Sequence, residues 1–383
     1  MSFLSKSSNI CYFKVVGEWT VDVLRVLAEN RFRSIIDSAA ELSSGWVHMD
    51  NYDRSDFTDD FIFRADRPLC FAFRQDRRKI PGAVFKKRVK ELSIQFLDDK
   101  PTMNRGPKAE MEGLRDQARS ELLSRTLPVP TCTDIVWDTN FRLLRFCSLS
   151  QNIIEAFQGL FHQSFPGLRL QIIHPLSKAT MVVTEPMQAR LEKLNQAQTD
   201  SALEQIEANR WIGWDFLRWL FYRTVNTDSR YSAKSTGPIL PGQPFTAFID
   251  RRLVMVGYGQ EGAQKVVVAG PQDHYSEVRS ALEQGKQIEE ATIILRLDDD
   301  DLEWKLTLKG ERFQFGSFNT PMIKVDQDPA DDPAAEAEAA FFAKLGAVET
   351  GEQLFDSLLR SFLDVRLDDE KWREESKADA FSA

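Results

Sequence analysis

The sequence has few of the residues and motifs on which most catalytic and metal sites depend. It contains four cysteines and four histidines among 383 residues. No CxxC pair, zinc-ligand spacing, GxSxG motif or P-loop occurs in it. These absences argue against a zinc site, a thiol–disulfide active site, a serine-hydrolase nucleophile and a phosphate-binding loop. We therefore expect a protein that is not an enzyme and that needs no metal and no cofactor.

The sequence also lacks the long apolar segments of membrane and exported proteins. No run of about 18 apolar residues occurs. Residues 1–10 are rich in serine, with one lysine and without the apolar core of a signal peptide. The cysteines lie mostly in apolar, strand-like runs, at Cys11, Cys70, Cys132 and Cys147. We expect them to be buried and reduced, as in a cytoplasmic protein.

Apolar and aromatic residues are abundant, and charge is unevenly distributed. Hydrophobic residues make up 42% of the chain, with 27 Phe and 8 Trp, which is enough for the cores of two or three domains. The net charge is −9, yet residues 74–90 contain eight basic residues and one acid. Residues 326–383 contain 16 acids and six bases. Contact with phosphate would explain the basic excess, and a solvated helix face is the other explanation.

The basic segment has the pattern of a strand, a turn and a helix. Residues 69–73 form an apolar run of strand length, and Pro81 stands where the first turn of a helix tolerates proline. Apolar residues then recur at helical spacing, at Val84, Phe85, Val89, Leu92 and Phe96. A polar connector at residues 98–108 and a second periodic segment at residues 109–123 predict a helical hairpin.

The sequence on either side of this hairpin predicts an α+β fold with mixed or antiparallel sheets. Residues 133–137 and 141–146 resemble a β-hairpin, so we expect the helical hairpin to project between strands 69–73 and 133–137. Further predictions are a helix capped by Thr20, and two C-terminal helices at residues 334–345 and 351–367. We divide the chain into an α+β region (1–75 and 130–180), the basic hairpin (76–129), a helical region and linker (181–242), a β-rich region (243–325) and an acidic linker with C-terminal helices (326–383).

One predicted helix, at residues 211–225, carries aromatic residues on every side. Its sequence, WIGWDFLRWLFYRTV, indicates either deep burial or a contact between subunits. A protein that does not bind DNA and assembles through residues 211–222 is therefore one alternative.

Two motifs resemble catalytic or cofactor sites. Residues 257–262 match GxGxxG, but β-branched residues at 265–269 predict a strand where a dinucleotide site needs a helix, so we interpret the motif as a hairpin turn. The aspartate run at 298–301, followed by Glu303 and Lys305, resembles the acids and lysine of metal-dependent nucleases. An aspartate run between strands is usually a solvated turn. A nuclease centred on Asp301, Glu303 and Lys305 stays the second alternative.

Several short motifs occur together in an order that resembles the recombination-associated protein RdgC family. The motifs are Gly45-Trp46-Val47, a strand that runs into the basic turn Lys79-Ile80-Pro81, the L-L-x-R segment Leu122-Leu123-Ser124-Arg125, and Trp137-Asp138-Thr139. None of them is diagnostic alone, but their order and spacing over about 130 residues form a moderately specific set. A weaker similarity surrounds residues 283–286.

The resemblance implies a ring-forming homodimer whose basic hole surrounds duplex DNA. It implies binding without sequence preference, restraint of the strand-exchange recombinase, and association with the nucleoid; binding of single-stranded DNA stays open. Local charge nominates the contact residues Arg74, Arg77, Arg78, Lys79, Lys86, Lys87, Arg88 and Lys90. The resemblance adds Arg125 of the L-L-x-R segment, and Gln272 and Lys286 as counterparts of DNA-facing turn residues.

The sequence also departs from the family pattern. In the family an aromatic-bearing segment that forms the dimer gate follows L-L-x-R, whereas here residues 127–130 are Leu-Pro-Val-Pro. The aromatic helix and the acidic C-terminal segment are additional to compact family members. Both differences leave the dimer contact and the partners open.

Overall fold

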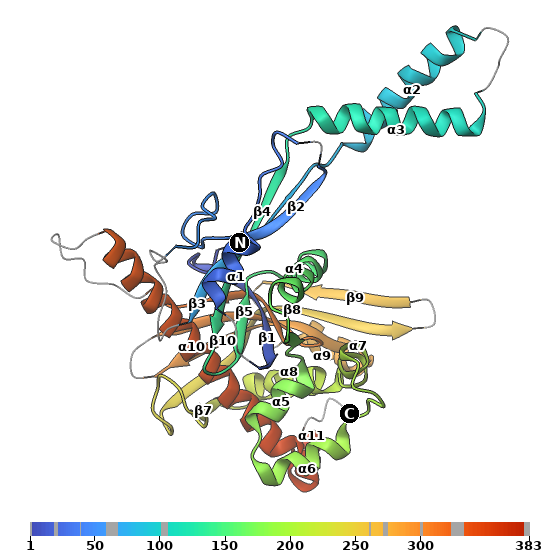
Figure 1. Cartoon of the computed structure of the whole chain (residues 1–383). Helices are drawn as coiled ribbons and strands as arrows, with labels where there is room; N and C mark the ends of the chain where they lie inside the picture. The colour runs from blue at the N-terminus through green and yellow to red at the C-terminus, as the bar shows by residue number, and fades with distance from the viewer. Residues whose placement is uncertain are drawn as a thin grey trace.

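Figure 1 shows the computed structural model of the chain, an α+β body from which a helical hairpin projects. The structure describes residues 2–18, 22–38, 40–58, 68–100, 106–259, 262–270, 275–298, 302–322 and 333–378. Every pairing between its named strands is antiparallel. The predicted α+β class with antiparallel sheets and an inserted helical hairpin is confirmed.

The strands form a single sheet to which both halves of the chain contribute. Its order is β2-β3-β4-β5-β1-β12-β11-β10-β8-β7, with β6 beside β1 and β9 beside β8. The N-terminal strands are β1 (Ser7–Gly17), β2 (Leu42–Val47), β3 (Leu69–Arg77), β4 (Val129–Asp138), β5 (Leu143–Phe146) and β6 (Leu168–Ile172). The C-terminal strands are β7 (Arg230–Ser232), β8 (Pro244–Gly259), β9 (Gly262–Val268), β10 (Gln287–Leu297), β11 (Glu303–Lys309) and β12 (Gln314–Asn319).

Strand β1 joins the two halves because its two ends pair with different partners. Ser7 and Ser8 pair with Asn319 and Phe318 of β12. Beyond a register shift, Cys11 pairs with Phe146 of β5, and the later residues of β1 also pair with β6. One hydrophobic core cluster accordingly contains residues from both ends of the chain.

The N-terminal half packs around aromatic side chains under α4 (Gln151–Ser164). Phe157 of this helix stacks on Phe146 with ring centroids 4.2 Å apart, and Trp46 donates a hydrogen bond from Nε1 to Ser164 Oγ at 2.9 Å. The neighbouring helix α1 (Val23–Glu29) begins at Asp22, whose carboxylate accepts from the amides of Leu24 and Arg25. The prediction that Thr20 caps this helix is therefore wrong, since Asp22 takes the position with a stronger acceptor.

The aromatic helix of the sequence, α8 (Trp211–Asn226), lies inside the C-terminal half. Its buried residues are Ile212, Gly213, Phe216, Leu217, Trp219, Leu220 and Phe221, and none of residues 211–225 is exposed. Phe216 and Trp219 both contact Phe362 of α10 (Pro333–Arg366). Of the two readings of this helix, deep burial within the chain is what the structure shows.

Helix α10 is continuous where the sequence predicts two helices, so the predicted break is wrong. Gly351 lies inside it, where glycine costs about 1 kcal/mol relative to alanine and does not end a packed helix. A Cβ at Gly351 would meet Trp304 Cδ1 at 2.7 Å. The glycine therefore serves close packing of α10 against β11 rather than a turn.

The remaining helices all belong to the body. They are α5 (Pro175–Val182), α6 (Glu185–Leu194), α7 (Ala202–Ala208), α9 (Ser276–Glu283) and α11 (Asp369–Ala378). The GxGxxG segment joins β8 to β9, and Gly259 pairs with Gly262 across the turn. No helix opens at the third glycine, because Gly262 begins β9, so the interpretation as a hairpin turn is confirmed.

The helical hairpin consists of α2 (Gly82–Asp98) and α3 (Lys108–Arg125) and extends away from the body on β3 and β4 (Figure 1). The two strands pair in register up to Arg77 and Val129, so they form its stem. Pro81 is the N-cap of α2, one position before the predicted first turn. Each helix contributes one buried residue to their contact, Leu92 and Ala118. A hairpin with so small a core leaves most of its side chains in solvent.

Candidate nucleic-acid interface

Exposed lysines gather on one side of α2. Lys86, Lys87 and Lys90 are exposed and lie on the side of the helix opposite Leu92, which faces α3. Within the described residues, the one acid at ion-pair distance from these lysines is Glu91, whose Oε1 lies 3.9 Å from Lys87 Nζ. At the foot of the helix, Arg77 and Lys79 are exposed as well. We call these five residues the α2 cationic face.

Arg88 and Arg125 belong to a different arrangement. Arg88 turns toward α3, where its Nε donates to Glu121 Oε2 at 2.9 Å, and its Nη1 donates to Glu91. Arg125 Nη2 lies 3.2 Å from the other oxygen of Glu121. Glu121 thus forms ion pairs with both arginines, and its pair with Arg88 joins the two helices of the hairpin.

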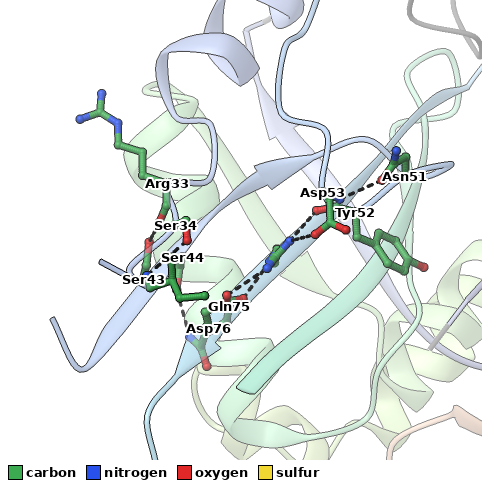
Figure 2. Close-up of polar contacts among 11 residues, drawn as sticks. Arg33, Ser34, Ser43, Ser44, Asn51, Tyr52, Asp53, Gln75 and Asp76 are labelled. Carbon is green, nitrogen blue, oxygen red and sulfur yellow. Dashed lines mark hydrogen bonds and ion pairs between the residues drawn. The ribbon is translucent and has the colours of Figure 1, made fainter. Parts of the chain in front are cut away.

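Arg74 lies at the stem and points into the protein. Its guanidinium donates to Asp76 Oδ1 at 2.8 Å, to Asp53 Oδ1 at 2.7 Å and to the Tyr52 carbonyl oxygen at 2.9 Å. Figure 2 labels these three acceptor residues. It also covers the ring of Phe32, at 4.4 Å from the centroid. The hydrogen bond to Asp76 is the main reason why the pKa of Arg74 is raised. With 14% of its side chain exposed, Arg74 fastens the segment around Tyr52 to β3.

Arg78 is buried, with 3% of its surface exposed. Its guanidinium donates to three backbone carbonyl oxygens, those of Ser38 at 2.6 Å, Ile35 at 2.8 Å and Ile36 at 3.0 Å. Through these Nη1 and Nη2 donors, Arg78 holds the segment before β2 against the end of β3. The basic cluster of the sequence therefore contains two arginines with internal partners beside five exposed cations.

The residues nominated in the C-terminal half lie apart from the hairpin. Lys286 stands between α9 and β10 in the body, half-buried, and its Nζ donates to Gln284 Oε1 at 2.8 Å. Gln272 lies outside the described residues. Within one chain, the structure does not bring Lys286 to the α2 cationic face.

Two residues that the sequence analysis did not single out complete the root of the hairpin. Glu41, just before β2, forms an ion pair with Arg119 of α3 at 2.9 Å. Both line a cavity of about 380 Å³ together with Arg77, Lys79 and Phe85. Glu41 and Arg119 are 78 positions apart, so no local pattern relates them.

The nuclease-like residues have partners of their own. Glu303 forms an ion pair with Arg296 at 2.6 Å, and Lys305 forms one with Asp250 at 2.5 Å. Asp301 lies outside the described residues. In the part of the chain that the structure describes, no three His, Cys, Asp or Glu residues are grouped as a metal site requires.

The cysteines are far from reactive. Cys11, Cys70 and Cys147 are buried and Cys132 is half-buried, all as free thiols. Burial raises the pKa of Cys11 to about 12 and that of Cys132 to about 11. Neutral thiols at physiological pH are poor nucleophiles, and the prediction of buried, reduced cysteines is confirmed for three of the four.

Comparison with known proteins assigns the family. Among the described residues, no helix combines the length and the apolarity that crossing a bilayer requires. No curated protein matches the chain. A family model does match, over residues 8–210, which is more than half of the chain; its description reads "Putative exonuclease, RdgC". The matched region begins in β1 and contains the whole helical hairpin. The chain therefore belongs to the RdgC family.

Proposed function

We propose that this protein binds duplex DNA without sequence preference through the α2 cationic face. The observation that carries the proposal is the set of five exposed cations on a projecting hairpin of a chain whose net charge is −9. A surface of this kind attracts phosphate and has no evident role in holding the fold together. Family membership supports the same conclusion.

The geometry suits contacts with the DNA backbone. With 17 residues, α2 is about 25 Å long, the length of about seven base pairs. Lysine presents a flexible point charge, whereas bidentate reading of a base usually uses arginine, asparagine or glutamine. The side chains of Lys86, Lys87 and Lys90 thus favour phosphates over base edges, and binding would be driven by release of counterions.

The basic residues nominated from the sequence fall into groups according to whether their side chains are exposed or bound within the protein. Arg77 and Lys79 stay in the proposed surface because they are exposed. We leave Arg74 and Arg78 out, since their guanidinium groups are bound inside the protein. Arg88 and Arg125 position the hairpin through Glu121.

The acidic part of the chain supports the same division of charge. Residues 326–383 carry 16 acids and six bases, a net charge of −10. Helix α11, which carries four of these acids and three of these bases, lies at the end of the body opposite the hairpin (Figure 1). DNA bound along α2 would therefore lie away from these four acids.

The second part of the proposal concerns assembly and biological role, and the family resemblance supports it. Two copies would form a ring around duplex DNA, with Lys286 and Gln272 facing the hole. The ring would act on the nucleoid as a clamp that restrains the strand-exchange recombinase, without catalysis of its own. Sedimentation velocity tests the assembly: a dimer is expected, and a monomer at all concentrations would contradict the ring.

Binding to short duplexes of unrelated sequence tests the first part. Fluorescence anisotropy across a salt series, with magnesium present, should give equal affinities that fall steeply with salt. The variant Lys86→Glu/Lys87→Glu/Lys90→Glu should lose at least about 100-fold in affinity. A control of equal charge change on the body, Arg169→Glu/Lys193→Glu/Arg373→Glu, should bind much more like the parent.

The same samples distinguish the alternatives. Intact DNA after incubation with magnesium is expected, and shortened DNA would favour the nuclease centred on Glu303 and Lys305. Absence of binding even at low salt would contradict the DNA-binding proposal altogether.

A further inference from the structure

The root of the helical hairpin contains a cavity whose lining differs from the rest of the α2 cationic face. Its volume, about 380 Å³, is within the range of about 300–1,000 Å³ for ligand pockets. Four of its lining residues are basic, Arg77, Arg78, Lys79 and Arg119. One is acidic, Glu41, so the lining carries a net charge of +3.

The positive charge of this root cavity is only partly neutralised. Glu41 is taken up by Arg119, with 2.9 Å between Oε2 and Nη2. No acid lies within ion-pair distance of Arg77 or Lys79 in the described part of the chain. Arg78 lies in the wall, and its buried Nε has no hydrogen-bond partner among the described residues. Arg77 and Lys79 therefore offer donors and positive charge to an anion in the cavity.

The first turn of α2 adds to the same cavity. Gly82, the first residue of the helix, lines it, and Pro81 at the N-cap makes no side-chain hydrogen bond to the helix. The first intrahelical bond runs from the Phe85 amide to the Pro81 carbonyl, so the amides before Phe85 have no acceptor within the helix. A Cβ placed on Gly82 would find no atom within 4 Å, which leaves room for a ligand at the helix end. A helix N-terminus of this length favours a negative charge.

The rest of the cavity lining is apolar, and this indicates what kind of molecule carries the anion. Ile80 and Phe85 line the cavity, and both are half-buried. An aromatic ring beside cations is the combination with which proteins hold a base and its phosphate. We propose that the root cavity binds a nucleotide through a terminal phosphate, with the base against Phe85, either as the end of a DNA strand or as a free mononucleotide. For its ligand class, this inference rests on the proposed function.

Titration calorimetry with the full chain tests the site. Deoxyadenosine 5′-monophosphate should bind more tightly than deoxyadenosine and more tightly than inorganic phosphate. Arg77→Gln and Lys79→Gln should each weaken the nucleotide roughly fivefold to tenfold. The matched variants Lys108→Gln and Arg115→Gln, exposed on α3 and outside the cavity, should leave it unchanged.

The variant Phe85→Leu tests whether the base of the nucleotide contacts Phe85 or whether the cavity only attracts an anion. It should weaken the nucleotide and leave the affinity for inorganic phosphate unchanged. Equal binding of nucleotide and nucleoside, equal binding of nucleotide and phosphate, or equal weakening by Lys79→Gln and Lys108→Gln would each overturn the inference.

Short oligonucleotides distinguish the two possible ligands, the end of a DNA strand and a free mononucleotide. If the ligand is a strand end, a 5′-phosphorylated trinucleotide should bind more tightly than its 5′-hydroxyl form and displace the mononucleotide; if it is free, the mononucleotide alone should bind. Binding of neither form would overturn the inference.

The variant Lys86→Glu/Lys87→Glu/Lys90→Glu distinguishes the root cavity from the three lysines of the α2 cationic face. It should lose affinity for duplex DNA and still bind the mononucleotide. Duplex binding without mononucleotide binding would leave the proposed function standing and remove only the root site.

Discussion

Arg145 in the body and Lys86 on the hairpin carry the same charge in opposite surroundings. Arg145 is 3% exposed and donates to both oxygens of Glu352, from Nε at 2.8 Å and from Nη2 at 2.7 Å. Lys86 is exposed, and in the described part of the chain no acid lies within ion-pair distance of it. The first cation is bound by an acid within the protein, whereas the second is exposed to solvent.

The surroundings of Arg145 extend this comparison to a whole network. Glu352 also accepts from the Tyr12 hydroxyl at 2.8 Å, and one turn further along α10, Asp356 accepts from Lys178 at 2.8 Å. The network joins α10 to β1, β5 and α5. These internal charges hold the two ends of the chain together, whereas Lys86, Lys87 and Lys90 of α2 are exposed.

The comparison predicts that the largest loss of stability follows from replacing Arg145. Arg145→Met leaves Glu352 buried without its cation and should lower the free energy of unfolding by about 3–5 kcal/mol. Urea unfolding followed by circular dichroism measures the loss. The double variant Arg145→Met/Glu352→Leu should recover much of it, since it removes both charges. A loss below about 1 kcal/mol in the single variant would show that the pair is not what holds α10 in place.

A smaller loss of stability is expected at Arg78, a buried arginine that directly follows the exposed Arg77 in the sequence. Arg78→Met leaves three backbone carbonyl oxygens without their donor and should cost about 2–3 kcal/mol of unfolding free energy. Arg77→Met changes an exposed residue and should cost less than about 0.5 kcal/mol. Equal losses in the two variants would contradict the division between internal and exposed arginines.

The pH dependence of stability tests the ionisation of Glu352. Burial opposes its ionisation, but Arg145 and the Tyr12 hydroxyl outweigh burial and lower the pKa of Glu352. A carboxyl with a lowered pKa stabilises the fold above its unfolded value of about 4.3 and loses this contribution as the pH falls through the folded value. Glu352→Gln should therefore be less stable than the parent at neutral pH, with a difference that narrows below about pH 4. A difference independent of pH would contradict this account.

The smallest expected effect on stability comes from the hairpin. Lys86→Gln should leave the unfolding free energy within about 0.5 kcal/mol of the parent. In DNA binding the same change should make the slope of log affinity against log salt shallower by about 0.9, the share of one phosphate contact. An unchanged slope would remove Lys86 from the α2 cationic face, and the exposed residue Lys108 serves as control.

The helical hairpin could be predicted from the sequence because its signals are local. Helical spacing from Val84 to Phe96 and the β-hairpin before residue 146 are properties of neighbouring residues. Antiparallel strands on either side then leave one place for the helices between them.

The roles of individual charges could not be predicted from local charge alone, because several of their partners are distant in the sequence. Arg74 and Arg78 stand in the same basic run as Arg77 and Lys79. The Asp53 partner of Arg74 is 21 positions away, and the backbone acceptors of Arg78 are 40 or more. Local charge counts therefore overestimate the exposed surface.

The break predicted in α10 illustrates a different limit. The sequence predicts that a second helix starts at Gly351, yet this glycine lies inside α10, and its small size is required by Trp304, a residue of β11. Tertiary packing thus overrides the local propensity. The root cavity lies beyond sequence reasoning for a similar reason, since Glu41 and Arg119 meet only after folding.

The most direct test of the account is the salt dependence of duplex binding for the parent and for Lys86→Glu/Lys87→Glu/Lys90→Glu. Five phosphate contacts per chain predict a slope of about −4.5 for the parent. Loss of three contacts should reduce its magnitude to about 2, with the unfolding free energy unchanged. Equal slopes for the two proteins would show that the DNA lies elsewhere and would contradict the assignment of the hairpin as the DNA-binding element.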